Sequence, residues 1–144
     1  MQIERIIRDK GTEVATIHLD APVSAAVAEL RRWNVGALVV SAADQPVAGI
    51  ISERDVVRGL ATDGAAVLDR PVAELMSPDV VTCARDVTVE DLMRMMTDRR
   101  IRHVPVVDGG ALVAIVSIGD VVKWRLGELE HETRALADYI TAGR

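Results

Sequence analysis

The same succession of strand-like and helix-like patterns of apolar residues occurs twice along this chain. A short strand-like run precedes a helix with apolar residues three and four apart, then two valine-rich strands and a second helix. The first copy places these elements at 14–17, 24–34, 36–41, 47–52 and from Glu53, and the second at 80–83, 89–100, 103–107, 111–117 and from Ile118. The pattern therefore predicts two β-α-β-β-α units.

The two copies align when the chain is shifted by 66 residues. This shift places Thr16 on Thr82, and a shift of 65 places Asp55 on Asp120 after one residue is lost in a turn. A unit of about 60 residues with a small sheet is marginally stable alone. We therefore expect an α/β (α+β) fold in which both repeats pack into one globule with pseudo-two-fold symmetry.

The repeat also divides the chain into four segments. A short helix is expected near 71–76, because proline suits a first helical turn. The expected segments are a first repeat at 8–66, a linker with this short helix at 67–79, a second repeat at 80–126 and a C-terminal helical extension at 127–144.

Composition excludes several classes of function. The chain has 144 residues, 49% of them apolar and 27% charged, which is enough to bury a core. It holds no phenylalanine, two tryptophans and one tyrosine, so binding of single-stranded nucleic acid by ring stacking is not expected. The formal net charge of −5 argues against a protein that coats DNA or RNA.

Membrane or targeting segments and cysteine chemistry contribute few clues to the function. No apolar run approaches the ~18 residues of a membrane span, and residues 1–5 do not read as a signal peptide, so a cytoplasmic protein without membrane contact is expected. The lone Cys83 excludes a disulfide within one chain and is predicted to be a buried thiol.

A strand that ends in serine and a helix with aspartate in its first turn occur once in each repeat. The residues are Ser52 and Asp55, and Ser117 and Asp120. One reading is structural, because the serine caps the helix and the acid completes a capping box. The other is a ligand site, where the serine and the helix N-terminus bind a phosphate and the carboxylate accepts hydrogen bonds from a ribose diol.

The copies differ in charge around this motif. Arg54 can pair with phosphate oxygens in the first copy, where the second copy has glycine, so the two sites should differ in anion affinity. Gly36 permits close approach of a flat ligand at the strand entry. The second copy has Arg102 and His103 there; His103 reads equally as a phosphate contact or a surface residue. The arginines at 99–100 read as a solvated helix end.

The duplicated order resembles a tandem pair of CBS domains (a Bateman module) of the small stand-alone kind, over about residues 8–126. This family implies adenosine ligands, namely AMP, ADP, ATP, S-adenosylmethionine or sometimes NAD, in clefts between the repeats. The motifs that carry the resemblance are Val14-Ala15-Thr16, Gly49-Ile50-Ile51-Ser52-Glu53-Arg54-Asp55, Glu74-Leu75-Met76-Ser77-Pro78, Ile101-Arg102-His103-Val104-Pro105-Val106-Val107 and Ile115-Val116-Ser117-Ile118-Gly119-Asp120.

The resemblance also implies residue roles. The serine and aspartate of each strand-helix motif correspond to phosphate and ribose contacts. The chain departs from the family at Ala114, where glycine is usual. Contacts to the base are implied near the first strand and the strand entry: Thr16, Gly36, Ala37 and Leu38 in one site, and Thr82, Arg102, His103, Val104 and Pro105 in the other.

The end of the chain carries a separate pattern. Apolar positions from residue 122 to residue 140 alternate spacings of four and three, which is a heptad-like stripe on a helix of about 22 residues. The stripe can pack back on the chain's own module or form a dimer contact.

These observations favour a regulatory module that binds an adenine nucleotide and signals through conformational change in a homodimer, with an unknown protein partner downstream. AMP is the leading ligand, with ATP, ADP or NAD as alternatives, and no further cofactor or metal is expected. A structural adaptor with vestigial clefts is the rival interpretation. An enzyme is not expected, because the three histidines are scattered and no catalytic motif occurs.

Overall fold

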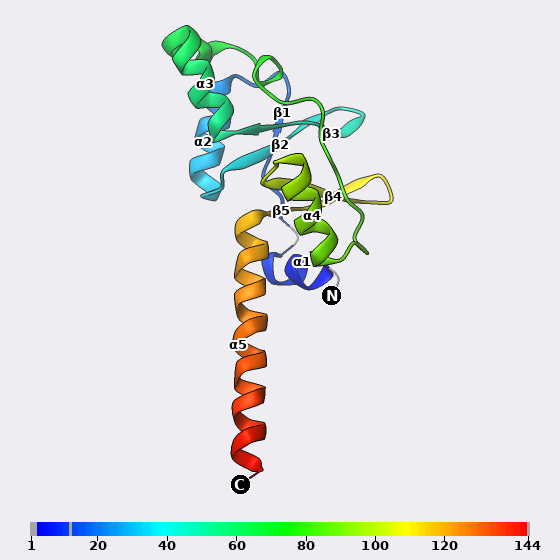
Figure 1. The fold of residues 1–144 in the computed structure, drawn as a ribbon. Coiled ribbons are helices and arrows are strands. Elements are labelled where there is room, and N and C mark those ends of the chain that lie inside the picture. Colours follow the sequence, from blue (N-terminus) through cyan, green and yellow to red (C-terminus); the bar gives the residue numbers. More distant parts are fainter. Residues whose placement is uncertain (1–2, 12, 144) are drawn as a thin grey trace.

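Two similar α/β units follow one another along the chain, as Figure 1 shows for the computed structural model, which describes residues 3–11 and 13–143. The expected mixed α+β class and the long C-terminal helix are confirmed. In chain order the elements are α1 (Glu4–Lys10), β1 (Thr16–His18), α2 (Val23–Trp33), β2 (Ala37–Ala42), β3 (Gln45–Ser52), α3 (Glu53–Asp63), the 3-10 helices Gly64–Asp69 and Val72–Glu74, α4 (Val89–Arg99), β4 (His103–Asp108), β5 (Ala111–Ser117) and α5 (Ile118–Ala142).

The two sheets are unequal. In the first unit β1 pairs in parallel with β2, and β2 pairs antiparallel with β3. In the second unit β4 and β5 form an antiparallel pair, and the strand expected at 80–83 is reduced to one parallel bridge between Cys83 and Val106. The reason is local: Val80 and Val81 line a cleft between the units, so only the end of the segment reaches β4. The expected linking helix is a short 3-10 turn, Val72–Glu74.

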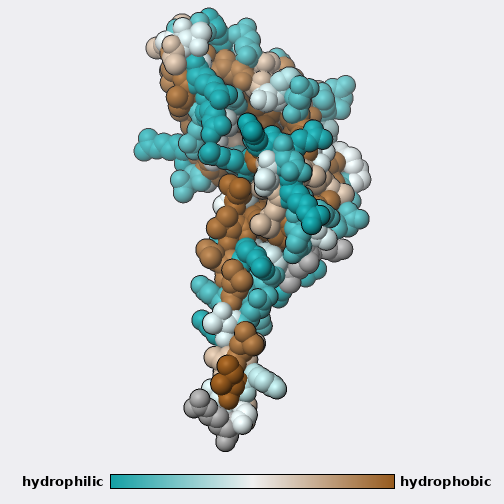
Figure 2. All heavy atoms as spheres, viewed as in Figure 1, coloured by the Kyte–Doolittle hydropathy of each residue, from teal (hydrophilic) through white to brown (hydrophobic). Residues whose placement is uncertain are grey.

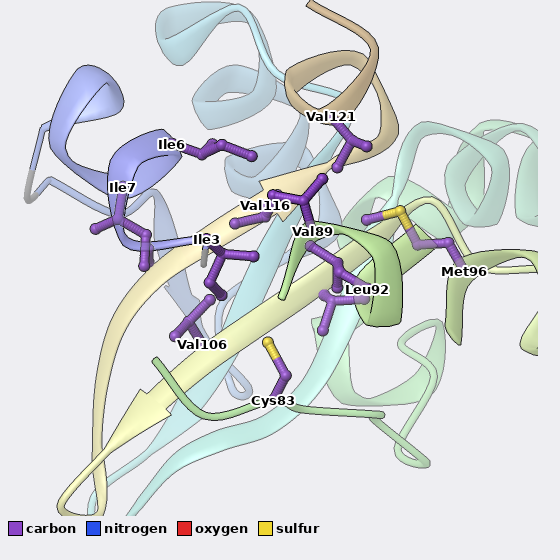
Figure 3. Packing of buried hydrophobic residues seen from close by; sticks show 12 residues of the cluster. Ile3, Ile6, Ile7, Cys83, Val89, Leu92, Met96, Val106, Val116 and Val121 are labelled. Atoms are coloured by element: carbon purple, nitrogen blue, oxygen red, sulfur yellow. The ribbon is translucent and has the colours of Figure 1, made fainter. Parts of the chain in front are cut away.

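Each unit has its own apolar core, and each core is completed by a segment outside the sheet. Val72 of the linker is fully buried in the first core, and Ile6 of α1 lies in the second. Figure 3 shows the α1 side chains facing those of α4, β4 and β5. The backbone N–H of Ile3 also donates to the carbonyl of Val87 at 3.0 Å. Helix α1 therefore belongs spatially to the second unit, although it precedes the first in the chain.

Helix α5 begins on the second unit and extends away from it (Figure 1). Val121 is its only buried residue, and every residue from 129 to 143 is exposed. In the part of the chain that the structure describes, no helix is long and apolar enough to cross a membrane.

Candidate functional site

A cleft of about 730 Å³ lies where the two units meet. This volume falls within the range of small-molecule sites. Three segments converge on it: the end of β3 with the start of α3, the linker after Met76, and the entry to β4. The lining residues are Gly36, Ile50, Ser52, Glu53, Arg54, Asp55, Val57, Ser77, Asp79, Val80, Val81, Arg100, Ile101, Arg102 and His103. We call it the first cleft.

The serine and aspartate motif of the first cleft is a complete capping box. Ser52 N donates to Asp55 Oδ2 at 2.9 Å, Ser52 Oγ donates to the same oxygen at 3.0 Å, and Asp55 N donates to Ser52 Oγ at 3.3 Å. The structural reading of this motif therefore holds. It does not exclude ligand binding, because Oδ1 of Asp55 takes no part in the box and meets no donor among the described residues.

Three arginines bring positive charge to the first cleft. Arg54 follows the serine cap, and Arg100 and Arg102 come from the other unit. Arg100 has φ 54°, a left-handed C-cap that ends α4 and turns the chain towards β4. Arg100 is therefore at the exposed end of α4, as the sequence suggested, and it also lines the cleft. Among the described residues, Arg54 has no ion-pair partner, which leaves its guanidinium available to an anion.

His103 is half-buried on the cleft wall opposite Gly36. A side-chain carbon at Gly36 would lie 3.6 Å from His103 Nε2 and 3.5 Å from Glu53 Oε1, so a bare glycine keeps this part of the cleft open. Burial lowers the pKa of His103 below its ordinary value of 6.5, and the nearby positive charge of Lys10 lowers it further. A neutral imidazole supplies one donor and one acceptor to a ligand.

The structure groups the expected site residues differently from the sequence. Gly36 was assigned to one site and Arg102 with His103 to the other, but all three line the first cleft, because the strand entries of the two units face each other. The remaining expected base contacts lie outside its lining. Thr16 and Thr82 are exposed, and Ala37, Leu38, Val104 and Pro105 are buried in the sheets.

Sequence reasoning missed the contribution of the linker. Ser77 pairs with Ile50 through two backbone hydrogen bonds of 2.8 and 3.0 Å, and this pairing leads Asp79, Val80 and Val81 along the cleft. The available signal was Ser77-Pro78, since a residue before proline favours extended backbone.

The second motif has the same capping box and a different neighbour. Ser117 N donates to Asp120 Oδ2 at 2.8 Å, and Lys10 Nζ donates to that same oxygen at 2.7 Å and to the carbonyl of Ile115 at 2.6 Å. The lysine bond and the serine bonds lower the pKa of Asp120 against the opposing effect of burial, which is the largest single contribution. Asp120 is thus ion-paired through Oδ2, while its Oδ1, like that of Asp55, meets no donor among the described residues.

Lys10 contacts the counterparts of two residues that line the first cleft. The repeat alignment carries Ile50 onto Ile115 and Asp55 onto Asp120. A cavity of about 610 Å³ does lie beside Asp120, but α1 and α5 line it, with Trp124 and His131 among its walls, so it is not the symmetry mate of the first cleft.

Metal ligands and the cysteine thiol are two further kinds of side chain that can carry chemistry. No group of three or more histidine, cysteine or carboxylate side chains that could hold a metal occurs in the described ranges. Burial raises the pKa of the Cys83 thiol to about 11, and Cys83 packs in the second core as a small apolar residue.

Comparison with known proteins assigns the family. The model of the CBS domain matches residues 6–62 and again 72–127. The chain belongs to the CBS-domain family, as a CBS pair. The mitochondrial CBS domain-containing protein CBSX3 of Arabidopsis thaliana is 38% identical over 128 residues, which cover 86% of this chain and 62% of that protein. The CBS pair thus spans somewhat less than two thirds of this relative.

Solved structures share the whole architecture. The CBS-domain protein ATU1752 from Agrobacterium tumefaciens is 42% identical with a TM-score of 0.83, and the match covers 87% of this chain and 99% of that one. The CBS pair of MJ0100, solved with 5′-methylthioadenosine and S-adenosyl-L-methionine, is 24% identical with a TM-score of 0.79 over 89% of this chain and 98% of that one. The similarity to MJ0100, at 24% identity, shows that the two chains share a fold.

Proposed function

We propose that this CBS pair binds an adenine nucleotide in the first cleft and transmits its occupancy through a homodimer to another protein. The observation that carries this proposal is the juxtaposition, in one ligand-sized cleft, of the open Oδ1 of Asp55 with Arg54, which has no ion-pair partner among the described residues. A carboxylate oxygen is the acceptor that a ribose diol needs, and an arginine fork is the donor that a phosphate needs.

Related proteins make an adenosine ligand the natural choice. MJ0100, which shares this fold, is solved with two adenosine compounds. The arginines of the first cleft favour a phosphate over the cationic sulfonium of S-adenosylmethionine. AMP is therefore the leading candidate, with ADP, ATP and NAD as alternatives. No catalytic step is proposed, and a cytoplasmic location stays a prediction.

Thermal unfolding with and without ligand tests the proposal. AMP, ADP, ATP, NADH and S-adenosylmethionine are each added at millimolar concentration. A ligand at about 100 times its Kd stabilises the folded state by about 2.7 kcal/mol, so AMP should raise Tm by several degrees. The absence of a shift with every ligand would overturn the nucleotide proposal and favour the adaptor interpretation.

Two matched variants locate the site. Asp55→Asn and Asp120→Asn each alter one capping box, so they carry a similar cost to helix stability. Asp55→Asn should remove the AMP-induced rise in Tm, whereas Asp120→Asn should keep it. A rise that survives Asp55→Asn and disappears in Asp120→Asn would place the ligand in the other half. Hydrolysis of ATP above a boiled control would contradict the non-catalytic assignment.

A further inference from the structure

The distal part of α5 carries an apolar stripe that nothing in the described chain covers. Figure 2 shows hydrophobic side chains running down the helix beyond the globule. The stripe residues Val122, Leu126, Leu129, Leu136 and Ile140 are between 42% and 64% exposed. An isolated helix of about 15 residues is marginal in water, so this segment needs a packing partner to be stable.

The spacing of the stripe identifies another helix as that partner. Steps of four and three residues give the 3.5-residue period of a left-handed coiled coil, and a stripe this narrow suits one helix better than a broad globular face. Val122, Leu129 and Leu136 occupy d positions, and Leu126, Thr133 and Ile140 occupy a positions. Leucine at two of the d positions and one polar residue at an a position suit two strands in one register.

Charges beside the stripe distinguish the two orientations. If two copies of α5 run parallel, Arg125 at a g position faces Glu130 at the following e position of the second copy, once on each side. Arg125 also pairs with Glu128 of its own helix, and its five donors suffice for both carboxylates. Parallel pairing therefore gains two ion pairs.

Antiparallel pairing brings like charges together. The register that sets Leu126 against Leu136 of the second copy places Glu130 opposite Glu130 and Glu132 opposite Glu132. Like charges across a helix pair are destabilising. The sequence thus disfavours this orientation of the full-length stripe.

An apolar groove at the base of α5 favours the same orientation. A cavity of about 190 Å³ lies between α4 and α5, and Met93 and Ile118, which line it, are 40% and 45% exposed. Parallel helices bring this groove and its copy to the same end, where they cover each other. Antiparallel helices leave the two grooves at opposite ends of a stripe about 27 Å long.

We propose that α5 forms a parallel two-stranded coiled coil with a second copy of this chain, in the register set by Arg125 and Glu130. The proposal specifies the contact within the homodimer of the proposed function, and it requires no nucleotide. It is therefore tested on the full chain without ligand.

Charge reversal provides the first test, by sedimentation of the wild type, Arg125→Glu and Glu130→Arg. The wild type should be a dimer, and each variant should dimerise about tenfold more weakly, because two attractive pairs become repulsive. An equal mixture of the two variants should restore wild-type dimerisation, since the introduced glutamate of one chain then faces the introduced arginine of the other. This rescue excludes misfolding of either variant. A monomeric wild type, a larger oligomer, or a mixture that stays dissociated would overturn the proposal.

Disulfide trapping provides the second test. Under mild oxidation Leu136→Cys should crosslink to itself, because position 136 faces its own copy only in a parallel pair. In the antiparallel register position 136 faces position 126, and the two copies of position 136 lie about 15 Å apart, beyond disulfide reach. A crosslink that forms only in a mixture of Leu126→Cys with Leu136→Cys would overturn the parallel assignment. The wild type, with its buried Cys83, is the control.

Discussion

The same serine and aspartate motif has different neighbours in the two halves of this CBS pair. In both motifs Oδ2 of the aspartate makes the capping box, and Oδ1 meets no donor among the described residues. Asp55 lines a cleft of about 730 Å³ and has no ion-pair partner among those residues. Asp120 makes the same capping box and is also bonded to Lys10 at 2.7 Å. The backbone geometry of the motif is therefore not what distinguishes the halves.

The difference originates in the segment that lies before the first strand of each repeat. The 66-residue shift carries Met76 of the linker onto Lys10 of α1. Met76 lies against Gly49 and packs on the first core, whereas Lys10 reaches across to Asp120. One change from a thioether to an ammonium group thus separates a motif that is ion-paired from one that has no ion-pair partner among the described residues.

The largest expected effect concerns the burial of α1. Ile6 is 4% exposed within the second core, so Ile6→Ala should lower the free energy of unfolding by about 2–4 kcal/mol in urea denaturation. Cys83 of that core should also become reactive to a thiol reagent, although its pKa of about 11 keeps it inert in the wild type. Val57→Ala, at a position 63% exposed, is the control and should change stability by less than about 0.5 kcal/mol. A loss below about 1 kcal/mol for Ile6→Ala would show that α1 does not complete this core.

A smaller effect is expected at Gly49, because the matching position in the second half is an alanine, Ala114. A side-chain carbon there would lie 2.9 Å from the carbonyl oxygen of Ser77, so Gly49→Ala must displace the linker and should cost about 2 kcal/mol. The second half tolerates Ala114 at this place, because the Lys10 side chain takes the position of a paired linker strand. Gly127→Ala, with open space around it in α5, should instead stabilise by about 0.5–1 kcal/mol. Equal effects of the two variants would contradict this account.

Removing the ion pair between Lys10 and Asp120 should make the ligand affinity of the second motif more similar to that of the first. Lys10→Met reproduces the first half, and we expect AMP affinity at the second motif to rise about tenfold, or about 1.4 kcal/mol. Titration calorimetry would then detect a second binding event per chain. Arg8→Met, an exposed change on the same helix, should leave binding unchanged. An unchanged stoichiometry for Lys10→Met would show that the ion pair does not block the second motif.

The sequence predicted the elements of this fold well, because each repeat carries clear periods. Helix α2 was expected at 24–34 and lies at Val23–Trp33, and the serine caps are where the motif placed them. The strand at 80–83 was wrong in extent, since its valines are as apolar as strand residues but line the cleft instead. The local sequence pattern does not show whether a valine will pack in a sheet or line a cleft.

The site was less predictable, because it depends on how the two units pack. Arg102 and His103 were identified as candidates, but their approach to Gly36 and Asp55 follows from strand entries that face each other across the pseudo-two-fold axis. Lys10 was missed because it lies at the start of the first repeat in the chain and acts in the second. Only the three-dimensional fold joins positions 110 residues apart.

The smallest expected effect is on the ionisation of His103, whose pKa depends on charged groups from both halves. Burial, Lys10 and Arg102 lower its pKa, while Asp120 and Glu53 raise it. Removing the positive charge in Lys10→Met leaves the Asp120 carboxylate unpaired nearby, so the pKa of His103 should rise by a fraction of a pH unit towards 6.5. NMR titration of the imidazole measures this, with His18→Gln and His131→Gln assigning the signals. Because the folded protein favours neutral His103, its contribution to stability is present above pH 6.5 and is lost as the pH falls through the lowered pKa. In Lys10→Met this loss should be smaller. A pKa that falls in Lys10→Met would mean that the ammonium group of Lys10 does not act on the cleft wall.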